Sequence, residues 1–328
     1  MKTSLLGPAT LLSIAACASA GQTSWEVLRD RGVSLQRQGR LEKARATYQE
    51  AYAVARSLDP GDPRRAHTLN CLCSVEHELD LRAEAERSCF RALSEAQSET
   101  QEARLNAFNS LHLLAVLKLE SGQQAYARQL VDRMQKLFDT FAGERVRLQG
   151  FLLYDRAFLD LMADRLSSAE QEFLAAAQCF QESENDTHVL ATALSHAGSV
   201  MIREHKYALA EKYVQESLDI LIGRYGRNYP ETVQDEVVLA QIRLQMGEPE
   251  EALPLLQHAL VTAESAFGPN DAMVRYVLET QARAFRRLGR KAEARKIEQR
   301  ATAIAKRLED NNSGRYLVDA QTLASQRR

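Results

Sequence analysis

The sequence predicts an all-α protein built as a solenoid of stacked helical hairpins. The 328 residues include only 15 Gly and 7 Pro, too few for the many tight turns of an all-β protein. From Trp25 to about Arg307, apolar residues recur at helical spacing, with polar breaks about every twenty residues. The pattern also repeats along the chain. Because a single short hairpin can bury its apolar face only against the next one, such repeats form a stacked solenoid.

Four columns of residues keep the repeat in step over seven periods. The first column is alanine throughout, and its members lie 41 or 42 residues apart: Ala44, Ala85, Ala127, Ala169, Ala210, Ala252 and Ala294. Twelve residues earlier stands a small residue: Gly32, Cys73, Ala115, Ala157, Gly198, Ala240 and Ala282. Seven residues later stand Ala51, Ala92, Met134, Ala176, Ser217, Ala259 and Ala301. Small residues at these spacings indicate two helices that approach each other closely in every repeat.

The fourth column predicts the turn between the two helices. Five residues before each alanine stands a turn-forming residue in six repeats, and His205 is the exception: Gly39, Asp80, Gly122, Asp164, Gly247 and Gly289. The seven repeats are expected to start near residues 25, 66, 108, 150, 191, 233 and 275, within a solenoid over 21–310. Asn and Gly after Asp310 disfavour further helix, so residues 311–328 should form either a tail or a short capping helix.

The first twenty residues have the pattern of an export signal. Lys2 precedes a short apolar core, and small residues follow from Ala15 to Ala20. Two outcomes stay open. Cleavage after Ala20 would leave a soluble periplasmic protein with the signal at 1–20. Alternatively, Ile14 to Cys17 resembles the lipobox of bacterial lipoproteins, so the signal would be 1–16 and a lipidated Cys17 would tether the protein to a membrane. No later stretch reaches the roughly 18 apolar residues of a transmembrane helix.

Composition and motifs favour a protein without catalytic chemistry. The chain carries 42 Lys and Arg against 44 Asp and Glu, so it lacks the basic excess that phosphate binding needs, and no nucleic-acid partner is expected. Nucleotide-binding, hydrolase and zinc-protease motifs are absent from the sequence. The densest group of metal-ligating residues is His67, Cys71, Cys73 and His77. Cys71 and Cys73 point roughly 160° apart around a helix, so no metal site and no cofactor are expected.

The repeat columns resemble the tetratricopeptide repeat family. That family has small residues at repeat positions 8, 20 and 27 and an aromatic or apolar residue at position 24. Position 24 here is Tyr48, Cys89, Val131, Phe173, Val214 and Leu256, with Glu298 as the departure in the last repeat. The long period, and loops at 223–230 and 267–271, resemble the kinesin-light-chain subtype, which often has groove asparagines where Asn70 stands. The resemblance covers residues 25–308 and implies a right-handed α-solenoid of about seven hairpins.

The resemblance also assigns residues to surfaces. Cys73 and Cys89 hold positions 8 and 24, on facing surfaces of one hairpin, so we expect either a disulfide or two buried free thiols. Positions 2, 5, 9 and 12 of the first helix line the concave groove in this family. The groove residues implied here are His67, Asn70, Ser74, His77, Asn109, His112, Phe151, Tyr154, Phe158, Ser195, Tyr276 and Arg283. The alternative is that the aromatic residues pack against the neighbouring repeat.

These features favour a non-catalytic interaction scaffold or adaptor of the bacterial cell envelope. Asn side chains can both donate to and accept from a peptide backbone, and aromatic side chains often anchor interfaces. The groove should therefore bind a protein or peptide partner, whose identity and oligomeric setting the sequence does not give. One alternative is a structural subunit of an envelope assembly that uses its convex face or ends. Another is a cytosolic peptide-responsive regulator, if the leader is not a signal.

Overall fold

The structure of the protein is a computed structural model that describes residues 24–143, 145–183 and 187–310. The predicted export signal, the lipidation of Cys17 and the tail or capping helix at 311–328 lie outside the described residues. Within those residues, no helix is both long and apolar enough to cross a membrane.

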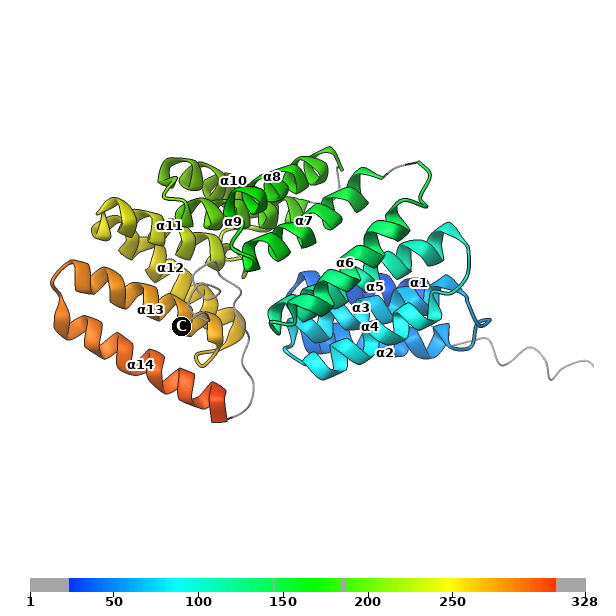
Figure 1. The fold of residues 1–328 in the computed structure, drawn as a ribbon. Coiled ribbons are helices and arrows are strands. Elements are labelled where there is room, and N and C mark those ends of the chain that lie inside the picture. The colour runs from blue at the N-terminus through cyan, green and yellow to red at the C-terminus, as the bar shows by residue number, and fades with distance from the viewer. Residues whose placement is uncertain (1–23, 144, 184–186, 311–328) are drawn as a thin grey trace, which may run out of the picture.

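The described residues form fourteen α-helices and no strand, so the all-α prediction is confirmed (Figure 1). The helices are α1 (Trp25–Arg37), α2 (Leu41–Ala55), α3 (Pro63–Glu78), α4 (Arg82–Glu95), α5 (Gln101–Glu120), α6 (Gln124–Phe138), α7 (Val146–Met162), α8 (Leu166–Glu182), α9 (Thr187–Arg203), α10 (Tyr207–Tyr225), α11 (Thr232–Met246), α12 (Pro249–Phe267), α13 (Ala272–Arg287) and α14 (Lys291–Asp310).

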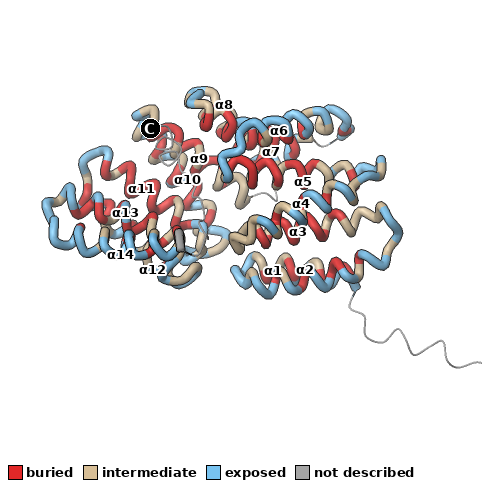
Figure 2. The backbone as a smooth tube through the Cα atoms, turned by 60° about the horizontal axis from the view of Figure 1, so that its bottom comes forward, coloured by how far each residue is buried: buried red, intermediate tan, exposed pale blue. Residues whose placement is uncertain are grey.

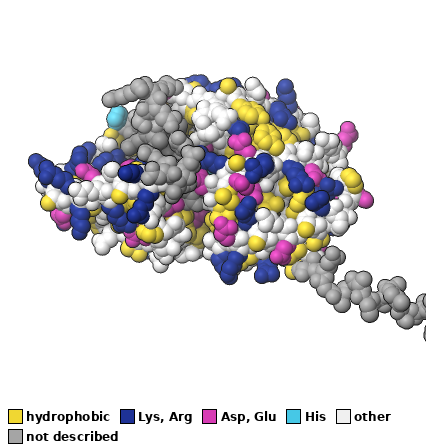
Figure 3. Space-filling view, turned by 90° about the horizontal axis from the view of Figure 1, so that it is seen from below, with side chains coloured by type: hydrophobic (Ala, Val, Ile, Leu, Met, Phe, Trp, Pro, Cys, Tyr) yellow, Lys and Arg dark blue, Asp and Glu magenta, His cyan; other side chains and the backbone are white. Residues whose placement is uncertain are grey.

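Consecutive helices pair into seven hairpins, and each hairpin packs on the next. Figure 1 shows them winding from α1–α6 on one side, through α7–α10, to α11–α14 on the other. Odd-numbered helices also contact one another between hairpins, as α3 does α5 and α9 does α11, so they form the inner layer of the superhelix. Buried residues follow the faces between hairpins, whereas exposed residues lie on the outer helices and turns (Figure 2). Lys, Arg, Asp and Glu side chains are interspersed over the face that Figure 3 presents.

The turn column has one backbone conformation in all seven hairpins. Gly39, Gly122, Gly247 and Gly289 have positive φ angles between 69° and 84°. Asp80, Asp164 and His205 take the same left-handed region at 59°, 63° and 59°. His205, the exception in the sequence column, therefore has the same left-handed backbone conformation as the glycines. A left-handed residue after the first helix ends it and reverses the chain, so this column fixes the angle of every hairpin.

Over the described part of the chain, the first helix begins before the predicted repeat start in six of the seven hairpins, including α3 and α5. Helix α3 begins at Pro63 rather than near 66, because the Asp62 side chain accepts a hydrogen bond from the Arg64 amide at 3.0 Å. Helix α5 begins at Gln101 rather than near 108, because Thr100 accepts one from the Ala103 amide at 3.2 Å. These N-caps satisfy amide groups that would otherwise lack partners in the first turn.

The small-residue columns lie where paired helices touch. The alanine column is buried, from Ala44 at 0% exposed to Ala294 at 1%. At Gly198 of α9, an added Cβ would lie 2.3 Å from Val214 Cγ2 and 3.1 Å from the Ala210 carbonyl oxygen, both on α10. In the second hairpin, Cys73 of α3 and Cys89 of α4 are joined by a disulfide with their Cα atoms 5.3 Å apart. Cys71 and Cys179 are free thiols.

We expect Gly198→Ala to lower the free energy of unfolding by about 1–3 kcal/mol, because the added methyl group overpacks the α9–α10 contact. Gly223→Ala is the matched control. Its Cβ would meet nothing within 4 Å, and alanine favours helix over glycine, so this change should be neutral or stabilising. Urea denaturation followed by circular dichroism measures both. Equal stability of the two variants would contradict a close helix contact at Gly198.

Candidate functional site

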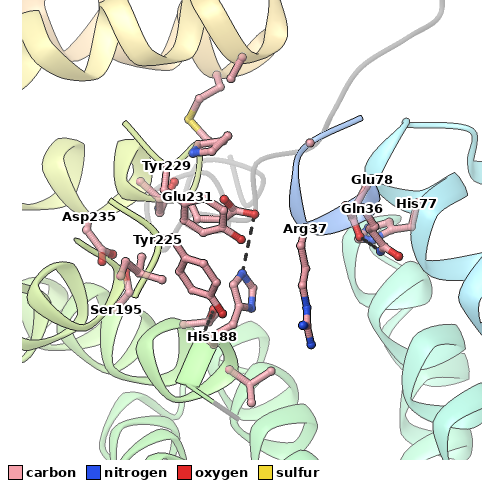
Figure 4. Close-up of a pocket in the computed structure, with 18 of the residues that line it drawn as sticks. Gln36, Arg37, His77, Glu78, His188, Ser195, Tyr225, Tyr229, Glu231 and Asp235 are labelled. Atoms are coloured by element: carbon pink, nitrogen blue, oxygen red, sulfur yellow. Dashed lines mark hydrogen bonds and ion pairs between the residues drawn. The ribbon is translucent and has the colours of Figure 1, made fainter. Parts of the chain in front are cut away.

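The inner surface of the superhelix lines an open cavity of about 1070 Å³. Most of its lining comes from the α1–α2 turn, from α3, α5, α7 and α9, from the α10–α11 loop and from the end of α12. The first hairpin and the α10–α11 loop therefore face each other across the cavity, although more than 180 residues separate them in the chain. Figure 4 shows this arrangement, with Gln36, His77 and Glu78 on one side and Tyr225, Tyr229 and Asp235 on the other.

We call Phe151, Tyr154, Phe158, Phe180 and His196 the aromatic floor, since all five line the cavity. Their rings meet mostly edge to face, with centroids 5.1 Å apart for Tyr154 and Phe158 and 4.8 Å apart for Phe158 and His196. Such contacts hold aromatic rings in place more firmly than burial alone. Burial lowers the pKa of His196 to about 4, so its ring is neutral at pH 7. The floor is therefore uncharged and apolar.

The N-terminal rim consists of Gln36, Arg37, His77 and Glu78. Gln36 Nε2 donates hydrogen bonds to Ser74 Oγ at 3.1 Å and to the Glu78 carboxylate. His77 Nε2 lies 2.8 Å from Glu120 Oε2. Burial alone would lower the pKa of His77, but the hydrogen bond with Glu120 raises it above its usual value. Arg37 is exposed and points toward the cavity (Figure 4).

The C-terminal rim consists of His188, Tyr225, Tyr229 and Glu231. The rings of Tyr225 and Tyr229 stack with centroids 4.3 Å apart, and His188 Nε2 lies 3.8 Å from Glu231 Oε1. Burial raises the pKa of Glu78 on the opposite rim, and the charge of Glu231 adds to that rise. Two carboxylates thus face each other across the cavity.

A buried carboxylate supports the wall beside the aromatic floor. Asp155 on α7 is 0% exposed, and its two oxygens lie 3.0 and 2.9 Å from His112 Nδ1. Burial raises the pKa of Asp155, and the contact with His112 opposes that rise. The His112 ring packs on Phe151 at 4.7 Å and lines the cavity. With Nδ1 facing Asp155, Nε2 is the remaining hydrogen-bonding atom of this ring.

We call Ser195, Ser217 and Asp235 the serine–aspartate niche. All three line the cavity from α9, α10 and α11, and each is less than 5% exposed. Ser217 Oγ lies 2.6 Å from Asp235 Oδ2 and 2.7 Å from the Ala191 carbonyl oxygen. Ser195 Oγ is buried and has no hydrogen-bond partner among the described residues.

Burial raises the pKa of Asp235 to about 7, and the nearby hydroxyl groups of Ser195 and Ser217 oppose that rise. The Ser217 hydroxyl has one proton and two acceptors within reach, so it can donate to only one of them. A protonated Asp235 resolves this, because its own O–H donates to Ser217 Oγ while Ser217 donates to Ala191. The niche thus holds a carboxyl group that is close to half-ionised at neutral pH.

Six of the twelve predicted groove residues line the cavity: His77, His112, Phe151, Tyr154, Phe158 and Ser195. Phe151, Tyr154 and Phe158 both line the cavity and pack against neighbouring side chains. Phe158 is only 8% exposed and packs on Phe173 at 5.1 Å, yet it still contributes to the cavity wall. The binding roles of these residues stay predictions.

The other six predicted groove residues lie outside the cavity lining. Asn70 is buried because its amide donates to the Asn106 carbonyl at 2.9 Å and its Oδ1 accepts from Ser110 at 2.7 Å, so it joins two hairpins. Tyr276 is buried and accepts a hydrogen bond from Gln241 at 2.8 Å. The remaining four are His67, Ser74, Asn109 and Arg283. The His67 ring packs edge-on to Trp25, and Ser74 Oγ accepts a hydrogen bond from Gln36. From the seventh hairpin, Met273 lines the cavity whereas Arg283 does not.

Sequence reasoning missed the C-terminal rim, His196 and Asp235. Residues 223–230 resemble an inter-repeat loop of the family, but nothing in that stretch of sequence predicts that the loop lies across the cavity from α1. Asp235 stands outside the positions that the groove rule selects. Its available signal was the pair of adjacent acids Asp235 and Glu236 between Val233 and Val237, since a charge rarely stands on a buried helix face without a partner.

We expect Asp235→Asn to stabilise the protein at pH 8. The pKa of Asp235 rises from 3.8 to about 7 on folding, so ionising it in the folded state costs roughly 4 kcal/mol, at about 1.4 kcal/mol per unit. The folded state keeps a proton that the unfolded chain has lost, so wild-type stability falls as pH rises from about 4 to 7. Urea denaturation across this range should show an advantage of the variant that grows with pH. A variant less stable than wild type at pH 8 would contradict this origin of the shift.

Comparison with known proteins agrees with the repeat architecture. A tetratricopeptide repeat family model matches residues 189–259 and 236–307, and no curated protein sequence matches the chain. A Rap protein complexed with competence and sporulation factor is 16% identical, with a TM-score of 0.64, over 87% of this chain and 76% of that one. The apo quorum sensor NprR from B. thuringiensis is 15% identical, with a TM-score of 0.61, over 86% and 76%.

BtubC (BKLC) from P. vanneervenii is 16% identical, with a TM-score of 0.57, over 70% of this chain and 92% of that one. At such identities these likenesses show a shared fold and nothing about a shared ligand. The resemblance to the kinesin-light-chain subtype stays a prediction. The family match identifies tetratricopeptide repeats within residues 189–307, and the same helical hairpin recurs from α1 to α14.

Proposed function

We propose that the protein is a non-catalytic interaction protein that binds a peptide, or an extended segment of a partner protein, inside the superhelix. The observation that carries this proposal is the open cavity of about 1070 Å³ lined by the inner helices and both rims. Small-molecule pockets have volumes of about 300–1,000 Å³, so this space suits several residues of an extended chain.

The lining matches that kind of ligand. The aromatic floor offers rigid apolar surface, which supplies contact area at little entropic cost. Gln36, His112 and the two tyrosines of the C-terminal rim offer hydrogen-bonding groups around it. The Rap neighbour was solved in complex with competence and sporulation factor, and NprR is a quorum sensor. A regulator of that kind is the second candidate for this chain, and it would use the same cavity.

The chemistry of the cavity supports binding rather than catalysis. Its best-formed acid–base pair is His112 with Asp155. A nucleophilic mechanism needs a hydroxyl or thiol in hydrogen-bond contact with such a histidine. Among the described residues, Asp155 is the hydrogen-bond partner of His112, and no hydroxyl or thiol contacts it. We therefore assign this pair to positioning the wall of the cavity.

We also propose that the protein works in the cell envelope, on the basis of the signal pattern in residues 1–20. Expression of the full-length gene in a Gram-negative host, followed by fractionation and intact mass, tests this setting. We expect either a soluble protein starting at Gly21 or a membrane-bound protein acylated at Cys17. A cytosolic protein that retains Met1 would overturn the envelope setting and favour the regulator.

Peptides that bind the wild type can be selected from a randomised library. We expect Thr192→Trp to weaken their binding at least about tenfold, equivalent to about 1.4 kcal/mol. Thr192 lines the cavity, so the indole occupies space that the peptide needs. Val261→Trp is the control, because Val261 is 63% exposed on α12. Isothermal titration calorimetry measures both. Peptides that bind Thr192→Trp as well as wild type, or that lose affinity for Val261→Trp, would place binding outside the cavity.

A further inference from the structure

We propose that the serine–aspartate niche is an anchoring subsite for a primary ammonium group, with the apolar part of the same ligand resting on the aromatic floor. Such a group comes from the amino terminus of a peptide or from a lysine side chain. This inference rests on the proposed function and specifies which ligands the cavity takes.

The first argument is the unused hydrogen-bonding capacity of the niche. An ionised carboxylate accepts about four hydrogen bonds, and buried groups normally use most of that capacity. Asp235 is 2% exposed, and its one hydrogen-bond contact within the described residues is Ser217. Ser195 Oγ, which is buried beside it without a partner, is a further acceptor. An ammonium group has three N–H donors and no acceptor, which complements both groups.

The second argument is charge. A buried carboxylate is costly unless a cation pairs with it, and no ion pair joins Asp235 to a described Lys, Arg or His. The charged groups that face it are Glu236 on its own helix and His188 on α9, which is paired with Glu231 instead. Glu236 in turn bonds His258 at 2.8 Å. A ligand cation would therefore supply the partner that the protein does not.

The third argument is the position of the niche beside the aromatic floor. Ser195 and His196 are consecutive residues of α9, and both line the cavity. Ser195 lies beside Asp235 of α11, whereas His196 packs on Phe158 at 4.8 Å and on Tyr154 at 5.8 Å. The two surfaces are thus one residue apart on the same helix. A ligand with an apolar group close to its ammonium group can contact both at once.

The half-ionised state of Asp235 gives this subsite a pH signature. Only the carboxylate form pairs with an ammonium group, and burial raises the pKa of Asp235 to about 7 in the empty protein. The dissociation constant should therefore stay level above pH 7 and rise toward tenfold per pH unit below it. Binding should also release a proton near neutral pH.

The test uses the full chain and phenethylamine, a primary ammonium next to an aromatic ring, titrated by NMR or calorimetry at about pH 7.5. Its amine keeps its charge over the range studied, as lysine does with a pKa of about 10.4. We expect binding to the wild type, at least about tenfold weaker binding to Asp235→Asn, and weaker binding to Ser195→Ala. Asp219→Asn is the matched control, since Asp219 lies exposed on α10 and makes the same charge change outside the cavity.

N-acetylphenethylamine is the uncharged analogue and should not bind. Phenylalanylglycinamide and N-acetyllysinamide distinguish the two sources, because only the first presents an amino terminus. The proposal is overturned if phenethylamine does not bind, if its acetylated form binds equally well, if Asp235→Asn binds like wild type, or if the dissociation constant is flat from about pH 5 to 8. If the ammonium subsite fails these tests but Thr192→Trp still weakens the binding of the selected peptides, the proposed function stands. Failure of the subsite and failure of the proposed function are therefore distinguishable.

Discussion

The structure depends on the close approach of the two helices in each hairpin. Buried alanines such as Ala127 and Ala210 set that distance, and a left-handed residue such as Asp80 or His205 sets the turn. Because the same geometry recurs in every hairpin, a small rotation accumulates along the solenoid. The accumulated rotation brings the α10–α11 loop opposite the first hairpin and so closes the cavity. The site is thus a property of the whole array rather than of one repeat.

The unfavourable electrostatics of the molecule lie along that inner surface. Asp155 and Asp235 stand on inner helices at 0% and 2% exposed, and burial raises the pKa of both. Asp155 has an internal partner in His112, whereas the hydrogen-bonding groups beside Asp235 are the hydroxyls of Ser195 and Ser217. An interior selected for stability alone would hold an apolar or amide residue at 235. The position therefore fits a site that gives up stability to recognise a ligand.

The sequence predicted the repeat well because its signal is local and repeated. Each helix pair shows its own apolar face, small residues and turn, so an error in one repeat, such as His205, does not hide the pattern. The site was harder because it depends on long-range closure. Asn70 fits the groove rule, yet its amide is used between hairpins. Glu231 and Tyr229 belong to a loop whose role appears only once the superhelix has turned back toward Gln36 (Figure 4).

The central claim is that a ligand occupies the inside of the superhelix. Hydrogen–deuterium exchange of the full chain, with and without a selected peptide, tests it most directly. Our account predicts slower exchange in α7, in α9 and in the α10–α11 loop, together with the α1–α2 turn, because these segments surround the cavity. Protection confined to outer helices such as α6 and α14, with the inner helices unchanged, would contradict it.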